Sequence, residues 1–524
     1  MGLSSWSRPV GGPTGRWPIF FLFAAASLLT RGPFLGPDFF NPDEATHLQG
    51  ALTLLRGGDL YRDFADNKPP LVHVFYALTQ LLYPGMASVH VVTVLLIVPL
   101  IAFAASAFFR HDRRGISAGL VFLLYSAAFT PGDMHATNCE LLFLVPASWA
   151  VALVGAERNE LGPARVVVAG VLFGLAVLFK QHAIAWLPAA ALVVGVGRME
   201  RGAGPRLLIP LAVGVIAPIA AMWIVFAARG VAGEAQYWLL RFSTSYFANP
   251  VQAGEVAVRL ARFLLPFLLI TAPLWVVCIR SLTTRLPRHQ IVFIASMIGC
   301  ISPLIFAGGR LFPHHYIPLY FPLALGAAPW VAARLQRPLP LGMKVLLGAP
   351  LIALLVFFAV DRGSRPADVL AAAVGAELRR DRCAGPAATL FVWGPEASFY
   401  YYSEMAPASR FVWPHETLSG FVSGNWGVQR GQVDARHLIR EDHWDLLMED
   451  LHRRSPAYVL DLSEAVAHWR PFALERFPRL RAFVAAHYEQ IVMAQGVRAY
   501  RRMGCSGPRL GSGGARQMHG TLRL

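Results

Sequence analysis

The chain reads Asn41-Pro-Asp-Glu-Ala-Thr46 and then Tyr61-Arg-Asp-Phe-Ala-Asp-Asn-Lys-Pro-Pro-Leu71. This stretch places a carboxylate pair, Asp43 and Glu44, and a lone lysine, Lys68, in one polar segment between apolar runs. Carboxylates accept protons from hydroxyl groups, and an ammonium group is a good partner for phosphate. The rest of the chain must show whether this segment lies at a membrane face.

Composition indicates a polytopic membrane protein. Hydrophobic residues make up 55% of the 524 residues and charged residues only 15%, with a mean hydropathy of +0.47. Lipid offers no hydrogen bonds to the backbone, so spans of this kind are expected to be α-helices of roughly 20 residues. About eleven apolar runs approach that length: residues 17–31, 88–109, 116–130, 139–156, 165–179, 183–197, 206–228, 260–279, 290–307, 314–333 and 343–360.

The distribution of arginine predicts the orientation. If residues 70–83 form an amphipathic helix along the interface, every short arginine-rich loop falls on the side of the N-terminus. Making this segment a span would break the pattern, in which positive residues collect in the cytoplasm. We therefore expect a cytoplasmic N-terminus (1–16), a retained signal-anchor helix in the first run, and an inner-membrane protein. Outer loops then cover residues 32–87, 131–138, 180–182, 229–259 and 308–313.

After about residue 361 the composition becomes more polar, which indicates a soluble α/β domain over residues 361–505, outside the cytoplasm. Runs at 389–393, 410–413 and 457–461 favour strands, and 487–502 favours a closing strand pair. Residues 506–524 are expected to be disordered. Cys383 and Cys505 flank this domain, so a disulfide between them is one reading in an oxidising compartment, whereas Cys139, Cys278 and Cys300 lie in or beside spans.

The net charge of +16 reflects dispersed arginines in short loops and in the C-terminal domain. No basic cluster with interleaved aromatic residues is present in the sequence, so nucleic acid is not an expected partner. The charge is a signal of topology.

Asp43 and Glu44 allow two interpretations. Ionisable groups next to a span are costly and often functional. Alternatively, the pair simply caps a helix that starts at Ala45, because Asn and Asp are preferred N-caps and acids favour the first turn. The sequence of this loop alone does not decide between catalysis and capping.

Lysine usage favours function. Only three of the 47 lysine and arginine residues are lysines, and two of them, Lys68 and Lys180, fall at the expected outer boundary. We expect Lys68 to bind a ligand phosphate, while Lys180 either shares that role or extends from a helix end to the interface.

The remaining outer loops also carry candidate residues. Glu140 begins a span, where it either caps the helix or faces a cavity. In the loop 229–259, Tyr237 and Arg241 suit sugar binding, although aromatic and arginine residues of an interfacial belt have the same pattern. Adjacent histidines favour phosphate, metal or interfacial hydrogen bonds; no cofactor is predicted, and a divalent metal is left open. The candidate substrate-binding residues are Asp133, His135, Tyr237, Arg241, His314, His315 and Tyr316, with Arg310 as a phosphate ligand.

The order of these motifs resembles that of the GT-C-type membrane glycosyltransferases, in particular the bacterial enzymes similar to lipid A aminoarabinose transferase and protein O-mannosyltransferase. The resemblance rests on Pro-Asp-Glu44, Tyr61-Arg-Asp-Phe64 and Lys68-Pro-Pro-Leu71, and it extends over most of residues 17–333. The runs Leu172-Phe-Gly-Leu-Ala-Val-Leu-Phe-Lys-Gln-His-Ala183 and His315-Tyr-Ile-Pro-Leu-Tyr320 fit it as well. Lys180-Gln-His182 differs from the Lys-Gly-Pro expected of the aminoarabinose enzymes, so the sugar is left open.

The resemblance implies a transmembrane catalytic domain over 17–360 and a sugar donor carried on polyprenyl phosphate. The acceptor would be a hydroxyl of a lipid, polysaccharide or protein, and transfer would invert the anomeric centre. Asp43 is the expected general base, with Glu44 and Glu140 holding the acceptor or sharing that role. Lys68, Arg310 and Lys180 would bind the donor phosphate.

Other functions are compatible with parts of the pattern. A transporter or flippase of an anionic lipid-linked sugar would also place charges near the membrane, but it should have broken spans and related halves, which the sequence lacks. An O-antigen ligase or polymerase type of enzyme, or an inactive scaffold, are further alternatives.

Overall fold

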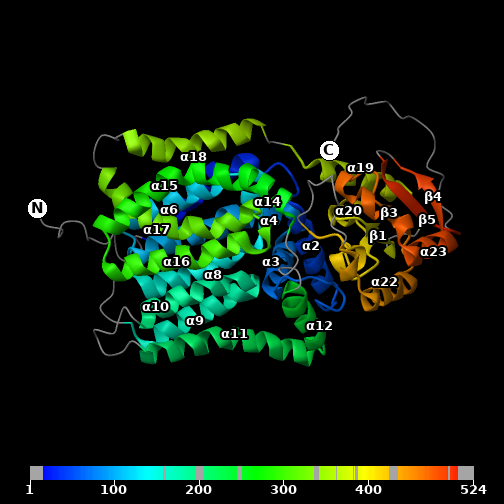
Figure 1. The fold of residues 1–524 in the computed structure, drawn as a ribbon, viewed down its shortest axis with the longest axis horizontal. Coiled ribbons are helices and arrows are strands. Elements are labelled where there is room, and N and C mark those ends of the chain that lie inside the picture. The colour runs from blue at the N-terminus through cyan, green and yellow to red at the C-terminus, as the bar shows by residue number, and fades with distance from the viewer. Residues whose placement is uncertain are drawn as a thin grey trace, which may run out of the picture. The chain divides into compact units, whose positions relative to one another are not determined.

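The computed structural model describes residues 16–156, 161–195, 205–244, 251–335, 341–360, 363–381, 383, 387–423, 435–493 and 496–504. It divides into two compact units (Figure 1). The first contains Met1–Phe40, Asn67–Gly233 and Val256–Gly363, and the second contains Asn41–Asp66, Glu234–Glu255 and Ser364–Leu524. Parts of two loops that the sequence assigns to the outer face, 32–87 and 229–259, therefore belong to the second unit.

The first unit is helical. Its helices and short helical turns are α1 (Trp17–Arg31), η3 (Gly32–Phe34), α3 (Pro70–Leu82), α4 (Met86–Val92), η4 (Thr93–Ile97), α5 (Val98–Phe108), α6 (Arg113–Ala127), α7 (Pro131–Met134), α8 (Cys139–Gly155), α9 (Pro163–Phe179), η5 (Gln181–Trp186), α10 (Leu187–Gly195), η7 (Pro205–Leu207), α11 (Leu208–Ala228), η9 (Leu260–Leu264), α15 (Leu265–Thr284), α16 (Arg288–Phe306), η10 (Ala307–Gly309), η11 (Pro313–Tyr316), α17 (Ile317–Arg334) and α18 (Leu341–Val360). Two further helices, α12 (Ala232–Gln236) and α14 (Ala253–Arg259), cross the division between the units.

Helix length and composition support a membrane protein. Among the described residues, six continuous helical segments are long and apolar enough to cross a bilayer: Trp17–Phe34, Met86–Phe108, Leu208–Ala228, Ala253–Thr284, Arg288–Phe306 and Pro313–Arg334. Shorter apolar helices cover Pro70–Leu82, Cys139–Gly155, Pro163–Phe179, Gln181–Gly195 and Gly348–Val360. The predicted helix at 70–83 is present as α3, and its place at the interface stays a prediction.

Close backbone contact joins α9 and α11, which run side by side at one edge of this unit (Figure 1). A Cβ on Gly170 would lie 2.4 Å from the backbone oxygen of Leu211, and one on Gly214 would lie 2.3 Å from that of Val167. Only glycine allows this separation, and small residues serve the same purpose between helices in lipid. This packing helps to fix the C-terminal end of α9, where Lys180 lies.

Helix α17 lies at the centre of the bundle. In the most apolar part of Pro313–Arg334, 94% of the residues are buried within the protein, compared with 11% in α11. Its neighbours include α15, α6 and α16. The short turn η11 precedes α17 directly, so the central helix positions the two histidines of that turn.

The second unit contains a five-stranded sheet in the order β2-β1-β3-β5-β4. Strand β1 (Thr389–Trp393) pairs in parallel with β2 (Ala406–Pro407) and β3 (Tyr458–Asp461), and β5 (Arg498–Arg502) pairs antiparallel with β3 and β4 (Tyr488–Val492). Its helical elements are α2 (Pro42–Leu55), η8 (Tyr237–Phe242), α19 (Pro366–Arg380), α20 (Ser398–Ser403), α21 (Glu416–Ser419), η13 (Arg436–Leu438), α22 (Glu441–Arg454), η14 (Ala467–Phe472), η15 (Leu474–Arg476) and α23 (Pro478–His487).

The predicted strands at 389–393 and 457–461 and the closing pair within 487–502 are confirmed, whereas a strand at 410–413 is wrong. Arg410 there donates through its side chain to Asp450, and its backbone oxygen accepts from Ala65 N at 2.9 Å. These bonds replace sheet pairing. Cys383 is disulfide-bonded, Cys139, Cys278 and Cys300 are free thiols, and the predicted partner Cys505, with residues 506–524, lies outside the described residues.

Candidate active site

A buried ion pair joins Glu140 and Lys180 in the first unit. Glu140 lies in the first turn of α8, and Lys180 follows the last residue of α9. The two residues are 3% and 7% exposed, and Lys180 Nζ donates to Glu140 Oε1. Because α8 and α9 pack together, the end of one helix is held against the start of the other, and the two opposite charges compensate each other away from water.

Two adjacent histidines complete this cluster from η11. His314 Nδ1 forms a hydrogen bond of 3.0 Å with Asp133 Oδ1, and its Nε2 lies 3.8 Å from Glu140 Oε1. His315 Nε2 lies 3.7 Å from the same oxygen. Asp133, His314, His315 and Lys180, predicted from three separate segments, are thus brought together around Glu140.

A pocket opens beside this cluster. It has a polar wall of Glu140, His182 and His315 and an otherwise apolar lining of Phe143, Trp186, Ile301, Leu304 and Pro318. The ring centroids of His182 and His315 are 6.2 Å apart in an edge-on arrangement. A polar wall facing apolar side chains suits a ligand with a charged and a hydrocarbon part.

Lys68 lies close to the same cluster through its neighbour. Lys68 Nζ lies 3.4 Å from Asn67 Oδ1, and Gln181 Nε2 donates to the backbone oxygen of Asn67 at 2.9 Å. The charge of Lys68 also acts electrostatically on His182. The segment that follows Lys180 therefore holds the loop that carries Lys68.

Arg310 and Tyr316 lie in the segment that precedes α17, as the histidines do, but make different contacts. Arg310 is buried, and its backbone oxygen accepts from Arg259 Nη1, while the Arg259 guanidinium lies over the ring of Phe312 at 5.0 Å. Tyr316 stacks on Phe267 with 4.4 Å between ring centroids. Arg310 is four residues before His314 in the chain, and its role as a phosphate ligand stays a prediction. Tyr316 has the contacts of a packed core residue.

His135 has a structural environment. Its Nε2 forms a hydrogen bond of 3.2 Å with the backbone oxygen of Ala127, and its ring packs on Phe34 at 4.4 Å. Arg31 holds the same segment by donating to the backbone oxygen of Met134 at 2.7 Å. The structure thus separates His135 from Asp133, although the two are adjacent in the predicted loop.

In the second unit, the predicted acid pair begins helix α2. Asn41 is the N-cap, and its Oδ1 accepts from Glu44 N at 3.3 Å. Glu44 is fully buried and Asp43 is half-buried. The cap residue is thus Asn41, and the helix starts at Pro42, earlier than the Ala45 start that the sequence suggests. Capping explains the local fold here without assigning a role to the Asp43 carboxylate.

Glu44 faces a positive charge within its own unit. Arg365 donates to Glu396 at 2.6 Å and lies 3.8 Å from Asp368. Burial lowers the pKa of Arg365, but the carboxylates of Glu396, Asp368 and Glu44 raise it above its usual value. This arrangement gives Glu44 a charge-balancing role and leaves Asp43 as the more accessible acid of the pair.

Tyr237 and Arg241 differ in environment. Tyr237 packs edge-on against His443 with 5.1 Å between ring centroids, and the Arg440 guanidinium lies 5.2 Å from the centre of its ring. Burial raises the pKa of Tyr237 to about 12. Arg241 is exposed. Packing against His443 of α22 explains the position of the Tyr237 ring. Sugar binding by Tyr237 or Arg241 stays a prediction.

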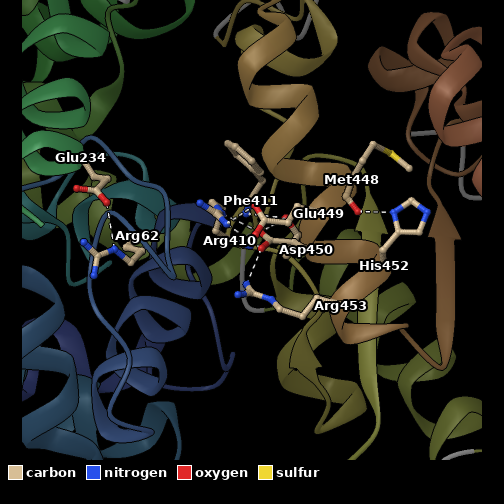
Figure 2. Close-up of polar contacts among 10 residues, drawn as sticks. Arg62, Glu234, Arg410, Phe411, Met448, Glu449, Asp450, His452 and Arg453 are labelled. Carbon is tan, nitrogen blue, oxygen red and sulfur yellow. Dashed lines mark hydrogen bonds and ion pairs between the residues drawn. The ribbon is translucent and has the colours of Figure 1, made fainter.

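The loops of the second unit are also held by charged contacts (Figure 2). Arg62 donates to Glu234 at 3.0 Å. This bond joins Asn41–Asp66 to Glu234–Glu255, two segments of the second unit that are far apart in sequence. Arg410 donates to both oxygens of Asp450, at 2.8 and 2.9 Å, and Arg453 donates to Oδ1 of the same carboxylate at 2.8 Å.

Sequence reasoning missed two residues near the cluster, His182 and Arg259. In Lys180-Gln-His182, the histidine two residues after one of only three lysines is a usable signal for His182. Arg259 is the last residue of the predicted outer loop 229–259, and no local pattern distinguishes it from other interfacial arginines.

Comparison with known proteins identifies the fold. No protein-family model matches the sequence, and a search of curated proteins finds no significant relative. The structure is similar to ArnT from Cupriavidus metallidurans bound to undecaprenyl phosphate, with a TM-score of 0.59 and 14% identity over 95% of this chain and 100% of that chain. The apo state of that protein matches with a TM-score of 0.58 and 13% identity over 93% of this chain and 98% of that chain. As its motifs predict, the chain has the fold of the GT-C glycosyltransferases.

Proposed function

We propose that this protein is a membrane glycosyltransferase that moves a sugar from a polyprenyl-phosphate donor to a hydroxyl acceptor at the outer face of the inner membrane. The observation that carries the proposal is a buried cluster of Glu140, Lys180 and His314 within a complete GT-C fold. Buried ionisable groups beside a pocket are costly to keep and often mark a functional site.

The donor phosphate is the first ligand to place. Lys68 is the preferred phosphate ligand, because Asn67 and Gln181 hold its loop beside Lys180 and because it begins the Lys-Pro-Pro-Leu71 motif that resembles the family. The pocket beside the cluster combines polar and apolar walls, as a lipid-linked phosphate requires. Undecaprenyl phosphate is bound in the similar ArnT structure, which supports the choice of donor class. Arg310 is a second candidate for the same phosphate.

Transfer would follow a single displacement. The acceptor hydroxyl attacks the anomeric carbon, and its proton passes to Asp43 as the general base. The bond from that carbon to the phosphate oxygen breaks, and its electrons leave with the polyprenyl phosphate, whose charge Lys68 stabilises. One displacement inverts the anomeric centre. Glu140 would help to hold the acceptor or share the base role.

The test measures free polyprenyl phosphate released from a panel of polyprenyl-phosphate sugars, with membrane extract as the source of acceptor. We expect wild-type protein to release it from one donor class, and Asp43→Asn to lower the rate by roughly 10²- to 10⁴-fold. Lys68→Ala should have a comparable effect. Asn41→Ala is the matched control, because it removes the helix cap beside Asp43 at a stability cost of about 1 kcal/mol and leaves both proposed groups in place.

Two further readouts complete the test. Inversion is checked by comparing the anomeric configuration of donor and product by NMR. If wild-type protein turns over no donor, yet a donor crosses proteoliposomes in a manner that depends on Lys68, the glycosyltransferase proposal is wrong and the protein is a transporter.

A further inference from the structure

The two histidines of η11 present the same ring nitrogen to one carboxylate oxygen. Their Nε2 atoms lie 3.8 and 3.7 Å from Glu140 Oε1. A candidate ligand atom from each of Glu140, His314 and His315 lies within 4.8 Å of the other two. In a tetrahedral zinc site with bonds of about 2.1 Å, neighbouring ligand atoms are about 3.4 Å apart. The three groups are thus nearly at the spacing of a shared metal.

The outer contacts of the histidines support the same arrangement. Asp133 Oδ1 bonds to His314 Nδ1 at 3.0 Å, which directs Nε2 towards Glu140. Carboxylates that bind the far nitrogen of a histidine in this way orient metal ligands in many proteins. His315 Nδ1 is buried and has no hydrogen-bond partner among the described residues. No hydrogen bond at Nδ1 therefore stabilises the positively charged imidazolium form of His315.

We propose that Glu140, His314 and His315 form a binding site for a divalent cation of the zinc class, with Asp133 as the residue that orients His314. Two imidazoles and one carboxylate are a zinc ligand set that leaves a fourth position open. His182 and His315 line the adjacent pocket together with Glu140, so the open position faces that pocket. This inference shares Glu140 and His314 with the proposed function, but it is tested by metal binding and not by transfer.

Lys180 gives the proposal a specific consequence. Its ammonium group pairs with Glu140 Oε1, the oxygen that both histidines face. A cation must therefore displace Lys180 from this oxygen, and metal and ammonium compete for the same carboxylate. Removing the ammonium should strengthen metal binding, whereas a variant that merely damages the fold would weaken it.

The experiment uses full-length protein in detergent, stripped with a chelator and free of any polyhistidine tag. Zn²⁺ is titrated by calorimetry, and Co²⁺ is added as a spectroscopic probe whose visible absorption reports tetrahedral coordination. We expect wild-type protein to bind Zn²⁺ saturably, with affinity reduced at least about tenfold in His314→Ala and His315→Ala, and about 10- to 100-fold in Asp133→Asn. Lys180→Met should bind more tightly than wild type.

His289→Gln is the matched control, because His289 lies in α16 outside the cluster, and it should bind as wild type does. The proposal is overturned if wild-type protein binds no more Zn²⁺ than the His314→Ala/His315→Ala double variant, or if Lys180→Met fails to tighten binding. Neither result bears on polyprenyl phosphate release, which is measured separately, so this inference and the proposed function fail independently.

Discussion

Lys180 and Glu140 pair across the junction of α9 and α8, and both side chains are almost fully buried. Removing one member of such a pair leaves an uncompensated charge inside the protein, at a cost of about 3–5 kcal/mol. We expect Lys180→Met and Glu140→Gln each to lower the free energy of unfolding by about that amount. The double variant should recover part of the loss, since neither charge remains.

Chemical denaturation in detergent measures the four free energies of this cycle. Lys344→Met serves as the control, because Lys344 is an exposed lysine in α18, and the change should stay within about 0.5 kcal/mol. A double variant that is as unstable as the sum of the single variants would show that the two charges are independent.

Sequence patterns located most of the secondary structure because those patterns are local. Apolar runs long enough for a span, and β-like runs such as Thr389–Trp393, carry their signal within a few residues. The error at residues 410–413 has a different origin. The contacts that hold Arg410 come from Asp450 and Ala65, which no local pattern reports.

The sequence predicted which residues belong to the candidate site, but not which of them are in contact. One segment supplied Asp133 and Glu140 and another supplied His314, and only the fold shows that they meet. His135 belongs to the same segment as Asp133 but turns to the backbone of Ala127, because it follows the end of α7 whereas Asp133 lies within that helix. Membership of the Tyr237 segment in the second unit also depends on long-range contacts, which a sequence cannot show.

The Arg410–Asp450 contact should be important for the stability of the second unit (Figure 2). Asp450 is 1% exposed. Burial raises the pKa of Asp450, but the hydrogen bonds and charge of Arg410 lower it below its usual value. Arg410→Ala should therefore cost about 2–4 kcal/mol, less than the full 3–5 kcal/mol for an isolated buried pair, because Arg453 still donates to Asp450.

Arg453→Ala is the matched control, since the Arg453 side chain is 54% exposed and exposed ion pairs contribute at most about 1 kcal/mol. Thermal unfolding of the full chain, followed by tryptophan fluorescence, measures both variants. Equal losses in the two variants would contradict the assignment of Arg410 as the main partner.

Glycine packing between α9 and α11 predicts a second stability effect. Gly170→Ala and Gly214→Ala would each place a Cβ within 2.4 Å of a backbone oxygen on the facing helix, which the helices can relieve only by moving apart. We expect each change to lower the melting temperature of the protein in detergent. In Gly299→Ala the new Cβ would meet nothing within 4 Å in α16, so helix propensity should make that change neutral or stabilising by up to about 1 kcal/mol. Destabilisation by Gly299→Ala of the same size would show that the effect is not steric.

Acidification should destabilise the second unit through His443. This side chain packs against Tyr237 and Trp238, and a hydrogen bond of 2.8 Å joins its Nδ1 to Thr417 Oγ1. Burial lowers the pKa of His443 from 6.5 to about 4. The unfolded chain therefore binds more protons than the folded chain between these values, so stability is complete above pH 6.5 and is lost as the pH falls towards 4, by at most about 3 kcal/mol from this residue. Melting of the full chain between pH 7.5 and 4.5 should show this loss in wild-type protein and a shallower loss in His443→Gln, while the exposed His487→Gln retains the wild-type slope. Parallel slopes in all three proteins would mean that His443 does not titrate on unfolding in this range, and the acid sensitivity would then have to come from other groups.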